Sequence, residues 1–146
     1  LTGAASIYYG DEAEIDGTID SNEGCRYPMP WGKDFRGCAH YRLYHTLCAL
    51  KKEHPALRLG GMKFLYARED TFAIARFTGE DVIVGVISKS DTAQTIRLPL
   101  GAVGAAEPAG EKDLLGSVLH WQREGLNAID LHMEPHAVYL FSCKLK

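Results

Sequence analysis

The feature that most constrains this fold is a series of short β-branched and aromatic runs after Gly60, each bounded by turn residues. Such a series is typical of an antiparallel β-sandwich. Strands are predicted near Met62–Arg68, Thr71–Thr78, Asp81–Lys89, Thr92–Leu98, Leu126–Met133 and His136–Lys144. Residues 100–110 are rich in Gly, Ala and Pro, which predicts a surface loop. We therefore expect residues 60–146 to form a sandwich domain.

Two of these runs indicate how their strands are buried. Residues 82–87 (VIVGVI) are apolar on both faces, which predicts a central strand of a sheet. Residues 127–133 alternate between apolar and polar side chains, which predicts a strand with one solvent-facing side.

The first third of the chain has a different texture. Ala5–Tyr9 is short, apolar and aromatic and stops at Gly10, which predicts one buried strand. Residues 11–33 carry several Gly and Pro residues and many acids, without helical or strand periodicity. A loop of this length within a compact chain is usually functional or disordered.

A single helix is predicted after this loop. Asp34 is a suitable N-cap, and Pro55 disfavours helical backbone at His54, so the helix should end there. Leu43, Leu47 and Leu50 recur at helical spacing and form an apolar stripe.

One strand and one helix cannot bury their own apolar surface, because a parallel strand needs neighbours that are joined through helices. We therefore expect residues 1–59 to be the last β/α unit of a (β/α)₈ barrel whose other units are missing. Leu1 stands in place of Met, and the opening residues lack the basic start and apolar middle of a signal peptide. Both observations favour an excised segment.

Composition excludes several kinds of partner. The 146 residues carry a formal net charge of −3, so no basic excess is available to hold nucleic acid. No apolar run approaches the roughly 20 residues of a membrane-spanning helix. The six histidines follow no metal-binding pattern, and we expect neither a metal nor a cofactor.

The four cysteines have no C-x-x-C spacing, which argues against a zinc knuckle or a redox motif. Free thiols in a reducing compartment, hence a cytoplasmic protein, are the favoured interpretation. Two disulfides in a secreted protein are the alternative.

Three segments of the first 57 residues resemble one enzyme family. Residues 3–12 (GAASIYYGDE) are similar to the eighth-strand segment G-x-P-x-x-Y-Y-G-x-E of the α-amylase superfamily, glycoside hydrolase family 13. Residues 25–31 (CRYPMPW) resemble the C-R-x-P-M-x-W box of its neopullulanase, cyclomaltodextrinase and oligo-glucosidase types. Residues 51–57 (KKEHPAL) resemble the end of the helix that follows. Ala5 departs from the pattern, since the family often has proline there.

The resemblance implies retaining hydrolysis or transfer at α-glucosidic bonds of starch or maltooligosaccharides. Such chemistry needs two carboxyl groups about 5–5.5 Å apart. In the family these groups lie on strands that precede the matched segments, so no catalytic residue maps onto this chain and we expect it to be inactive alone. Asp11 and Glu12 are adjacent at the predicted strand end and would point to opposite faces, which argues against a catalytic pair.

The resemblance also implies substrate-binding residues in the loop. Arg26 matches an arginine that binds glucose hydroxyls in neopullulanase-like enzymes, and Asn22 occupies the place of an aspartate with the same role. Each has a structural alternative, which for Arg26 is the anchoring of the loop through backbone carbonyls. Trp31 is a candidate for stacking on a sugar ring, with a buried anchor as the favoured alternative.

The same sequence is compatible with two other functions. A non-catalytic α-glucan-binding module would show coplanar exposed rings among Tyr66, Phe72, Trp121 and Tyr139. A structural or dimerisation domain would show an exposed apolar stripe on the helix that contains Leu43 and Leu50. Since the predicted barrel is incomplete, we expect the chain either to self-associate through this uncovered surface or to pack it on its own sandwich.

Overall fold

The computed structural model describes residues 2–18, 20, 24 and 26–146. It divides into two compact units, one of residues 3–53 and one of residues 54–146 together with Thr2. The short helix α2 (Pro55–Leu59) belongs to the second unit and contacts strands β2 (Thr71–Phe77) and β3 (Val82–Ser88). The predicted domain boundary after Leu59 stays a prediction.

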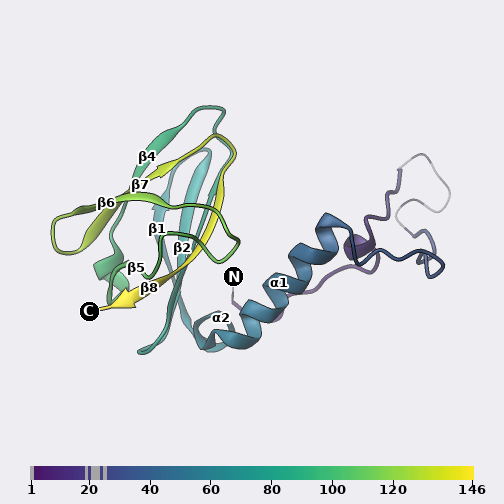
Figure 1. Ribbon diagram of the computed structural model, residues 1–146, viewed down its shortest axis with the longest axis horizontal. Helices are drawn as coiled ribbons and strands as arrows, with labels where there is room; N and C mark the ends of the chain where they lie inside the picture. Colours follow the sequence, from purple (N-terminus) through teal and green to yellow (C-terminus); the bar gives the residue numbers. More distant parts are fainter. Residues whose placement is uncertain (1, 19, 21–23, 25) are drawn as a thin grey trace. The chain divides into compact units, whose positions relative to one another are not determined.

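Eight strands form the second unit (Figure 1). Their order in the larger sheet is β1-β2-β3-β8-β5, and in the smaller sheet it is β4-β7-β6. All neighbouring strands are antiparallel, so the predicted antiparallel architecture of this region is confirmed. The bounds are β1 (Gly61–Ala67), β2 (Thr71–Phe77), β3 (Val82–Ser88), β4 (Gln94–Leu98), β5 (Ala105–Pro108), β6 (His120–Glu124), β7 (Ala128–Met133) and β8 (Val138–Leu145).

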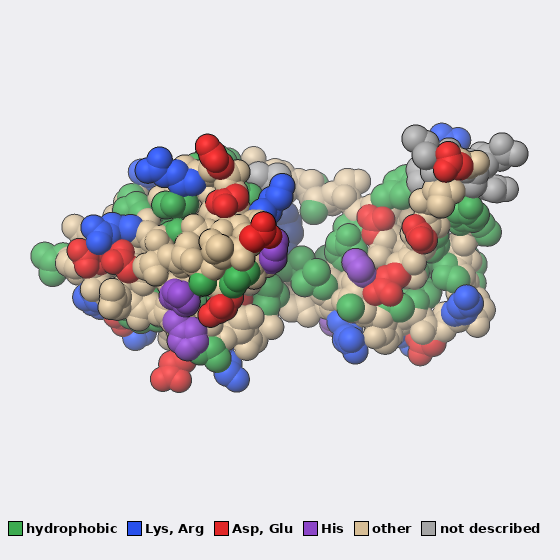
Figure 2. Space-filling model, turned by 90° about the horizontal axis from the view of Figure 1, so that it is seen from above, with side chains coloured by type: hydrophobic (Ala, Val, Ile, Leu, Met, Phe, Trp, Pro, Cys, Tyr) green, Lys and Arg blue, Asp and Glu red, His purple; other side chains and the backbone are tan. Residues whose placement is uncertain are grey.

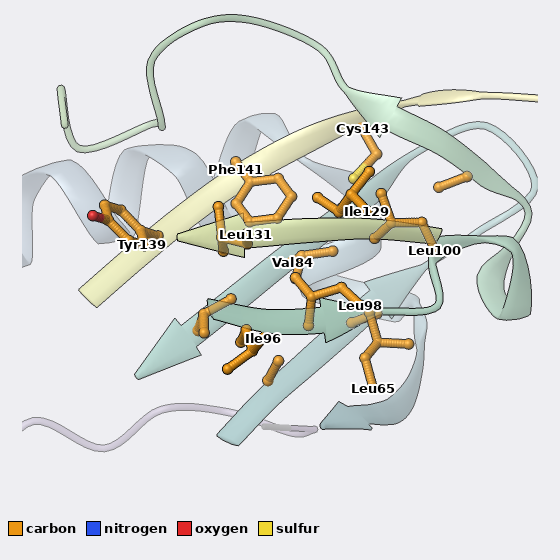
Figure 3. Close-up of a cluster of buried hydrophobic side chains, with 14 of the residues drawn as sticks. Leu65, Val84, Ile96, Leu98, Leu100, Ile129, Leu131, Tyr139, Phe141 and Cys143 are labelled. Carbon is orange, nitrogen blue, oxygen red and sulfur yellow. The ribbon is translucent and has the colours of Figure 1, made fainter. Parts of the chain in front are cut away.

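The core lies between the two sheets (Figure 3). Val84 and Phe141 enter it from the larger sheet, and Ile96, Ile129 and Leu131 enter it from the smaller one. Each of these five side chains is at most 1% exposed. The prediction that residues 82–87 form a central strand is confirmed, since β3 is the middle strand of five and even its outward-facing Ile83 is buried.

Three elements of the sandwich were not predicted. The expected surface loop at residues 100–110 contains the 3-10 helix η2 (Leu100–Val103) and strand β5, which pairs with β8. Strand β6 has one large apolar side chain, Trp121, and therefore lacks the alternation by which the other strands are recognised.

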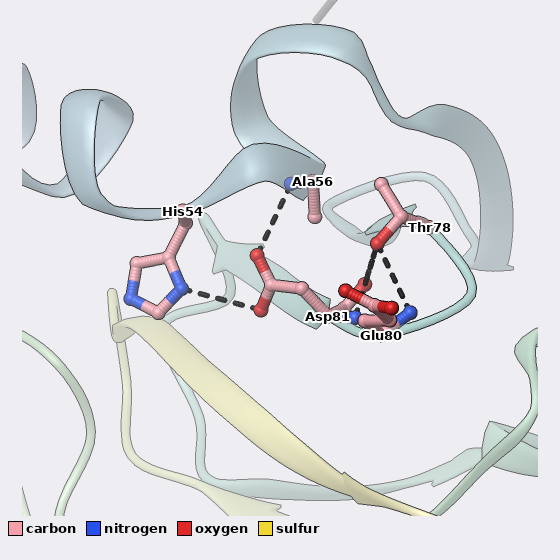
Figure 4. A network of polar contacts seen from close by, with 5 residues as sticks. All are labelled: His54, Ala56, Thr78, Glu80 and Asp81. Atoms are coloured by element: carbon pink, nitrogen blue, oxygen red, sulfur yellow. Dashed lines mark hydrogen bonds and ion pairs between the residues drawn. The ribbon is translucent and has the colours of Figure 1, made fainter.

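The α2 helix is attached to the sandwich by partly buried polar contacts (Figure 4). The Asp81 carboxylate lies 3.2 Å from Nδ1 of His54 and accepts the backbone N–H of Ala56 at 3.1 Å. Beside it, Arg76 is 5% exposed and donates to the carbonyls of Gly60 and Gly61. A Cβ at Gly60 would lie 2.4 Å from the carbonyl oxygen of Ala56, so this close approach requires glycine.

In the first unit, helix α1 (Ala39–Glu53) begins five residues after the expected cap. The Asp34 carboxylate instead accepts the N–H of Arg36, and a turn closes from Cys38 to Phe35 before the helix starts. The predicted end is confirmed, because His54 is extended and α2 starts at Pro55. No helix among the described residues is long and apolar enough to span a membrane.

The strand predicted at Ala5–Tyr9 is not formed, which corrects the expectation of a buried strand. Ile7, Tyr8 and Tyr9 are 42–49% exposed. The physical reason is that a strand requires hydrogen bonds to a neighbour, and no described strand of this chain pairs with it. A complete β/α barrel unit is therefore not seen here.

Candidate functional site

The segment that resembles the family's eighth strand ends in a tight turn. Gly10 has a φ of +94°, and a Cβ there would lie 2.7 Å from the Ile15 side chain, so the position requires glycine. The 3-10 helix η1 (Asp11–Ala13) follows, and the Glu12 carboxylate accepts the backbone N–H of Gly10 at 3.0 Å. Glu12 therefore stabilises the turn.

The end of this turn is tied to the start of α1. The Glu14 carboxylate accepts the backbone N–H of His40 at 3.3 Å and lies 2.8 Å from its Nδ1. The hydrogen bond from the His40 side chain lowers the pKa of Glu14. At the other end of the helix, Lys51 donates to the carbonyl of Gly3 at 3.0 Å.

Two hollows lie among the described residues of the first unit. One has a volume of about 560 Å³ and is lined by Asp11, Glu14, Ile15, Asp16, His40 and Tyr44. The other has a volume of about 360 Å³ and is formed by the consecutive residues 31–36. His40 and Tyr44 were not recognised from the sequence, because only the fold of the turn brings the helix start beside the acidic residues.

The three predicted substrate-binding residues have different outcomes. Asn22 lies outside the described residues. Arg26 is exposed. Trp31 is 80% exposed and lines the smaller hollow with Phe35 and Arg36, so its interpretation as a buried anchor is wrong. An exposed indole in a hollow is a surface on which a sugar ring can stack, but the stacking itself stays a prediction.

Three of the four aromatic side chains singled out in the sandwich are buried or packed against the core. Tyr139 is 6% exposed, and Tyr66 and Trp121 pack against the core. Phe72 is 38% exposed and lies on the outer face of the larger sheet. One exposed ring among these four does not meet the expectation of two or more coplanar exposed rings in a glucan-binding module.

The thiols within the described part of the chain are free at Cys38, Cys48 and Cys143. Burial raises the pKa of Cys143 to about 12, so this thiol is a packing group and not a nucleophile at neutral pH. Among the same described residues, no three His, Cys, Asp or Glu side chains gather in an arrangement that could hold a metal ion.

An antiparallel sandwich preceded by a loop and helix is a class of architecture that many proteins share, so sequence comparison decides the family. The profile of the neopullulanase-like C-terminal domain family matches residues 62–141, more than half of the chain. This chain belongs to that family, and its resemblance to glycoside hydrolase family 13 is confirmed.

Relatives and solved structures agree with this assignment. A cyclomaltodextrinase from Bacillus sp. is 36% identical over 97 residues, covering 65% of this chain and 17% of that protein. A solved cyclomaltodextrinase structure is 28% identical with a TM-score of 0.65, covering 94% of this chain and 23% of the other. The debranching enzyme from Nostoc punctiforme, at 23% identity, shares the fold with a TM-score of 0.74 over 97% of this chain and 28% of its own. The chain thus spans less than a third of each protein.

Proposed function

We propose that this chain is the C-terminal region of a retaining α-glucoside hydrolase or transglycosidase that acts on starch or maltooligosaccharides. The observation that carries the proposal is the family match of the sandwich, together with relatives that are cyclomaltodextrinases and amylopullulanases. In this proposal residues 1–59 are the last strand, loop and helix of the catalytic barrel, and residues 60–146 are the domain that follows it.

Exposed apolar side chains support the proposed barrel origin of the first unit. Ile7, Tyr8 and Tyr9 are 42–49% exposed, and Leu43 and Leu47 are 45% and 37% exposed on α1. Hydrophobic side chains are frequent on the surface of this unit (Figure 2). Contiguous apolar surface marks a binding face, and strands and helices of a closed barrel would cover it.

The sandwich has an apolar outer face of its own, which we assign to packing against the barrel. On the larger sheet, Phe72, Ile87 and Val138 are directly paired across three strands and are 38–48% exposed. Phe64, 56% exposed, pairs with Ile74 in the neighbouring row. Directly paired residues share a face of a sheet, so these side chains form one patch.

The catalytic carboxylates are proposed to lie outside this chain. Retaining hydrolysis needs two carboxyl groups that are free to act on one glycosidic bond. In this chain Glu12 accepts a backbone N–H and Glu14 is held by His40, so both acids stabilise the turn. These contacts support a structural role for the acids.

This proposal predicts that the purified 146-residue chain does not hydrolyse maltooligosaccharides or cyclodextrins above the uncatalysed rate. A longer product that includes the upstream coding region should hydrolyse them with retention of anomeric configuration, measured by NMR of the fresh product. Glucan cleavage by the 146-residue chain, or an upstream region without paired carboxylates on β/α units, would contradict the proposal.

The loop that contains Arg26 and Trp31, which we call the donor loop, is proposed to contact sugar at a donor subsite of the longer enzyme. We expect the Arg26→Ala substitution to weaken maltohexaose binding about tenfold, because a charged donor to a hydroxyl is lost. The measurement is fluorescence titration in a Trp121→Phe background, where Trp31 is the reporter. Arg68→Ala removes an exposed arginine that lies outside this hollow and serves as the control. An equal effect of both substitutions would refute the role of Arg26.

Exposed Leu43 and Leu47 also favour self-association of the isolated chain. We expect sedimentation velocity to show oligomers that grow with concentration, and the double substitution Leu43→Glu and Leu47→Glu to restore the monomer. Ala49→Glu, on another exposed face of α1, should leave the oligomers unchanged. A monomer at every concentration, with the first unit ordered as described, would rule out this surface as an interface.

A further inference from the structure

The outer face of the smaller sheet is polar, in contrast to that of the larger sheet. Thr95, His132 and His120 form one directly paired row across β4, β7 and β6. Arg97, Asp130 and Gln122 form the next row on the same face. The alternate rows face inward and include buried Ile96 and Leu131. The two rows thus present only polar side chains to solvent.

A hollow of about 300 Å³ lies on this face. It is lined by Thr95, His120, Trp121, Gln122, Asp130 and His132. Its volume is at the lower end of the range for small-molecule sites. Figure 2 shows charged and histidine side chains distributed over the visible surface of the sandwich, with no single large apolar area among them.

The charges around the hollow are matched within the protein. Arg97 donates to both carboxylate oxygens of Asp130, at 3.0 and 3.3 Å, and lies 3.1 Å from Glu124. The hydrogen bond to Arg97 lowers the pKa of Asp130. A charged ligand would therefore meet groups that are already paired, and an uncharged polar ligand suits the surface better.

The remaining groups suit hydroxyl ligands. Thr95 and Gln122 both donate and accept hydrogen bonds, and so do the imidazoles of His120 and His132 as a pair. A sugar hydroxyl needs both kinds of partner. The Oγ1 atom of Thr95 lies 3.5 Å from Nδ1 of His132, so these two side chains stand together on one side of the hollow.

We propose that this hollow is an accessory site for a short α-glucan segment, separate from the donor loop. The sugar class rests on the proposed function. The site stays accessible in a larger protein because the apolar outer face of the other sheet is the one suited to packing. Since the Trp121 ring packs against the core, stacking is limited and the expected Kd is about 1 mM.

The test is a titration of the ¹⁵N-labelled chain with maltohexaose, followed by amide chemical shifts. We expect saturable shifts at residues 95, 120–122 and 130–132. The double substitution His120→Thr and Gln122→Thr should raise the Kd at this site at least about fivefold, while both replacements remain good strand formers. His136→Asn is the matched control at an exposed histidine outside the hollow, where Asn tolerates the φ of +53°.

Further measurements distinguish failure of the accessory site from failure of the proposed function. Arg26→Ala should leave the shifts at residues 120–122 unchanged. No shift in the hollow, shifts confined to residues 26–36, or equal binding of cellohexaose would overturn the accessory site. None of these three results would change the prediction that the catalytic activity belongs to a longer product.

Discussion

We expect the Phe141→Ala substitution to lower the free energy of unfolding of the sandwich by about 3–5 kcal/mol. Phe141 is 1% exposed and lies between the two sheets, where it packs with side chains of both (Figure 3). Removing its ring leaves a cavity that strands on both sides cannot close. Single domains are stable by only about 5–15 kcal/mol, so much of the stability is lost.

Urea unfolding in a Trp31→Phe background provides the measurement, because Trp121 packs against this core and then reports alone. Phe72→Ala is the matched control. Phe72 is 38% exposed on the outer face of β2, so its replacement by alanine should lower the free energy of unfolding by less than about 1.5 kcal/mol. Equal losses for the two substitutions would show that Phe141 is not at the centre of the core.

We expect the Asp113→Ala substitution to lower the free energy of unfolding of the sandwich by about 2–4 kcal/mol, which is the second large effect. The Asp113 side chain is buried and accepts three backbone N–H groups. Two come from its own loop, from Leu115 and Ser117, and the third comes from Leu140 on β8. Alanine leaves all three donors without this partner, and the loop keeps the backbone hydrogen bond from Leu114 to the Leu140 carbonyl as its contact with β8.

The Asp113→Asn substitution separates hydrogen bonding from packing, because asparagine keeps one carbonyl oxygen as an acceptor. We expect it to lower the free energy of unfolding by an amount between zero and the loss in Asp113→Ala. Hydrogen exchange of the Ser117 and Leu140 amides should accelerate in Asp113→Ala. The control is Asp91→Ala, whose side chain is 92% exposed and whose removal should change stability by about 0.5 kcal/mol at most. Unchanged exchange at Leu140 would contradict the proposed attachment.

Local sequence patterns were sufficient to predict most strands of the sandwich. Strand β7 alternates between buried and half-buried residues as predicted, and β3 is the middle strand of its sheet as predicted from its apolar run. Strands β5 and β6 were missed for a physical reason. Their stability comes from pairing with β8 and β7, and their own side chains carry no alternating apolar pattern.

In the first unit, local sequence patterns were not sufficient to predict the structure. Ala5–Tyr9 has the composition of a strand, but composition cannot supply the neighbouring strand on which its hydrogen bonds depend. For the donor loop, the sequence singled out Trp31, and the structure shows that its indole is exposed instead of packed. His40 and Tyr44 line the larger hollow because the turn that carries Glu14 brings the acidic residues beside the start of α1.

The sequence by itself determined the positions of most strands, the end of α1 at Pro55 and the family, because alternation, proline geometry and motifs are local properties of the chain. Tertiary structure alone decided which polar side chains share a surface. Thr95, His120 and His132 come from three strands up to 37 residues apart, and only the order β4-β7-β6 and its register place them in one row.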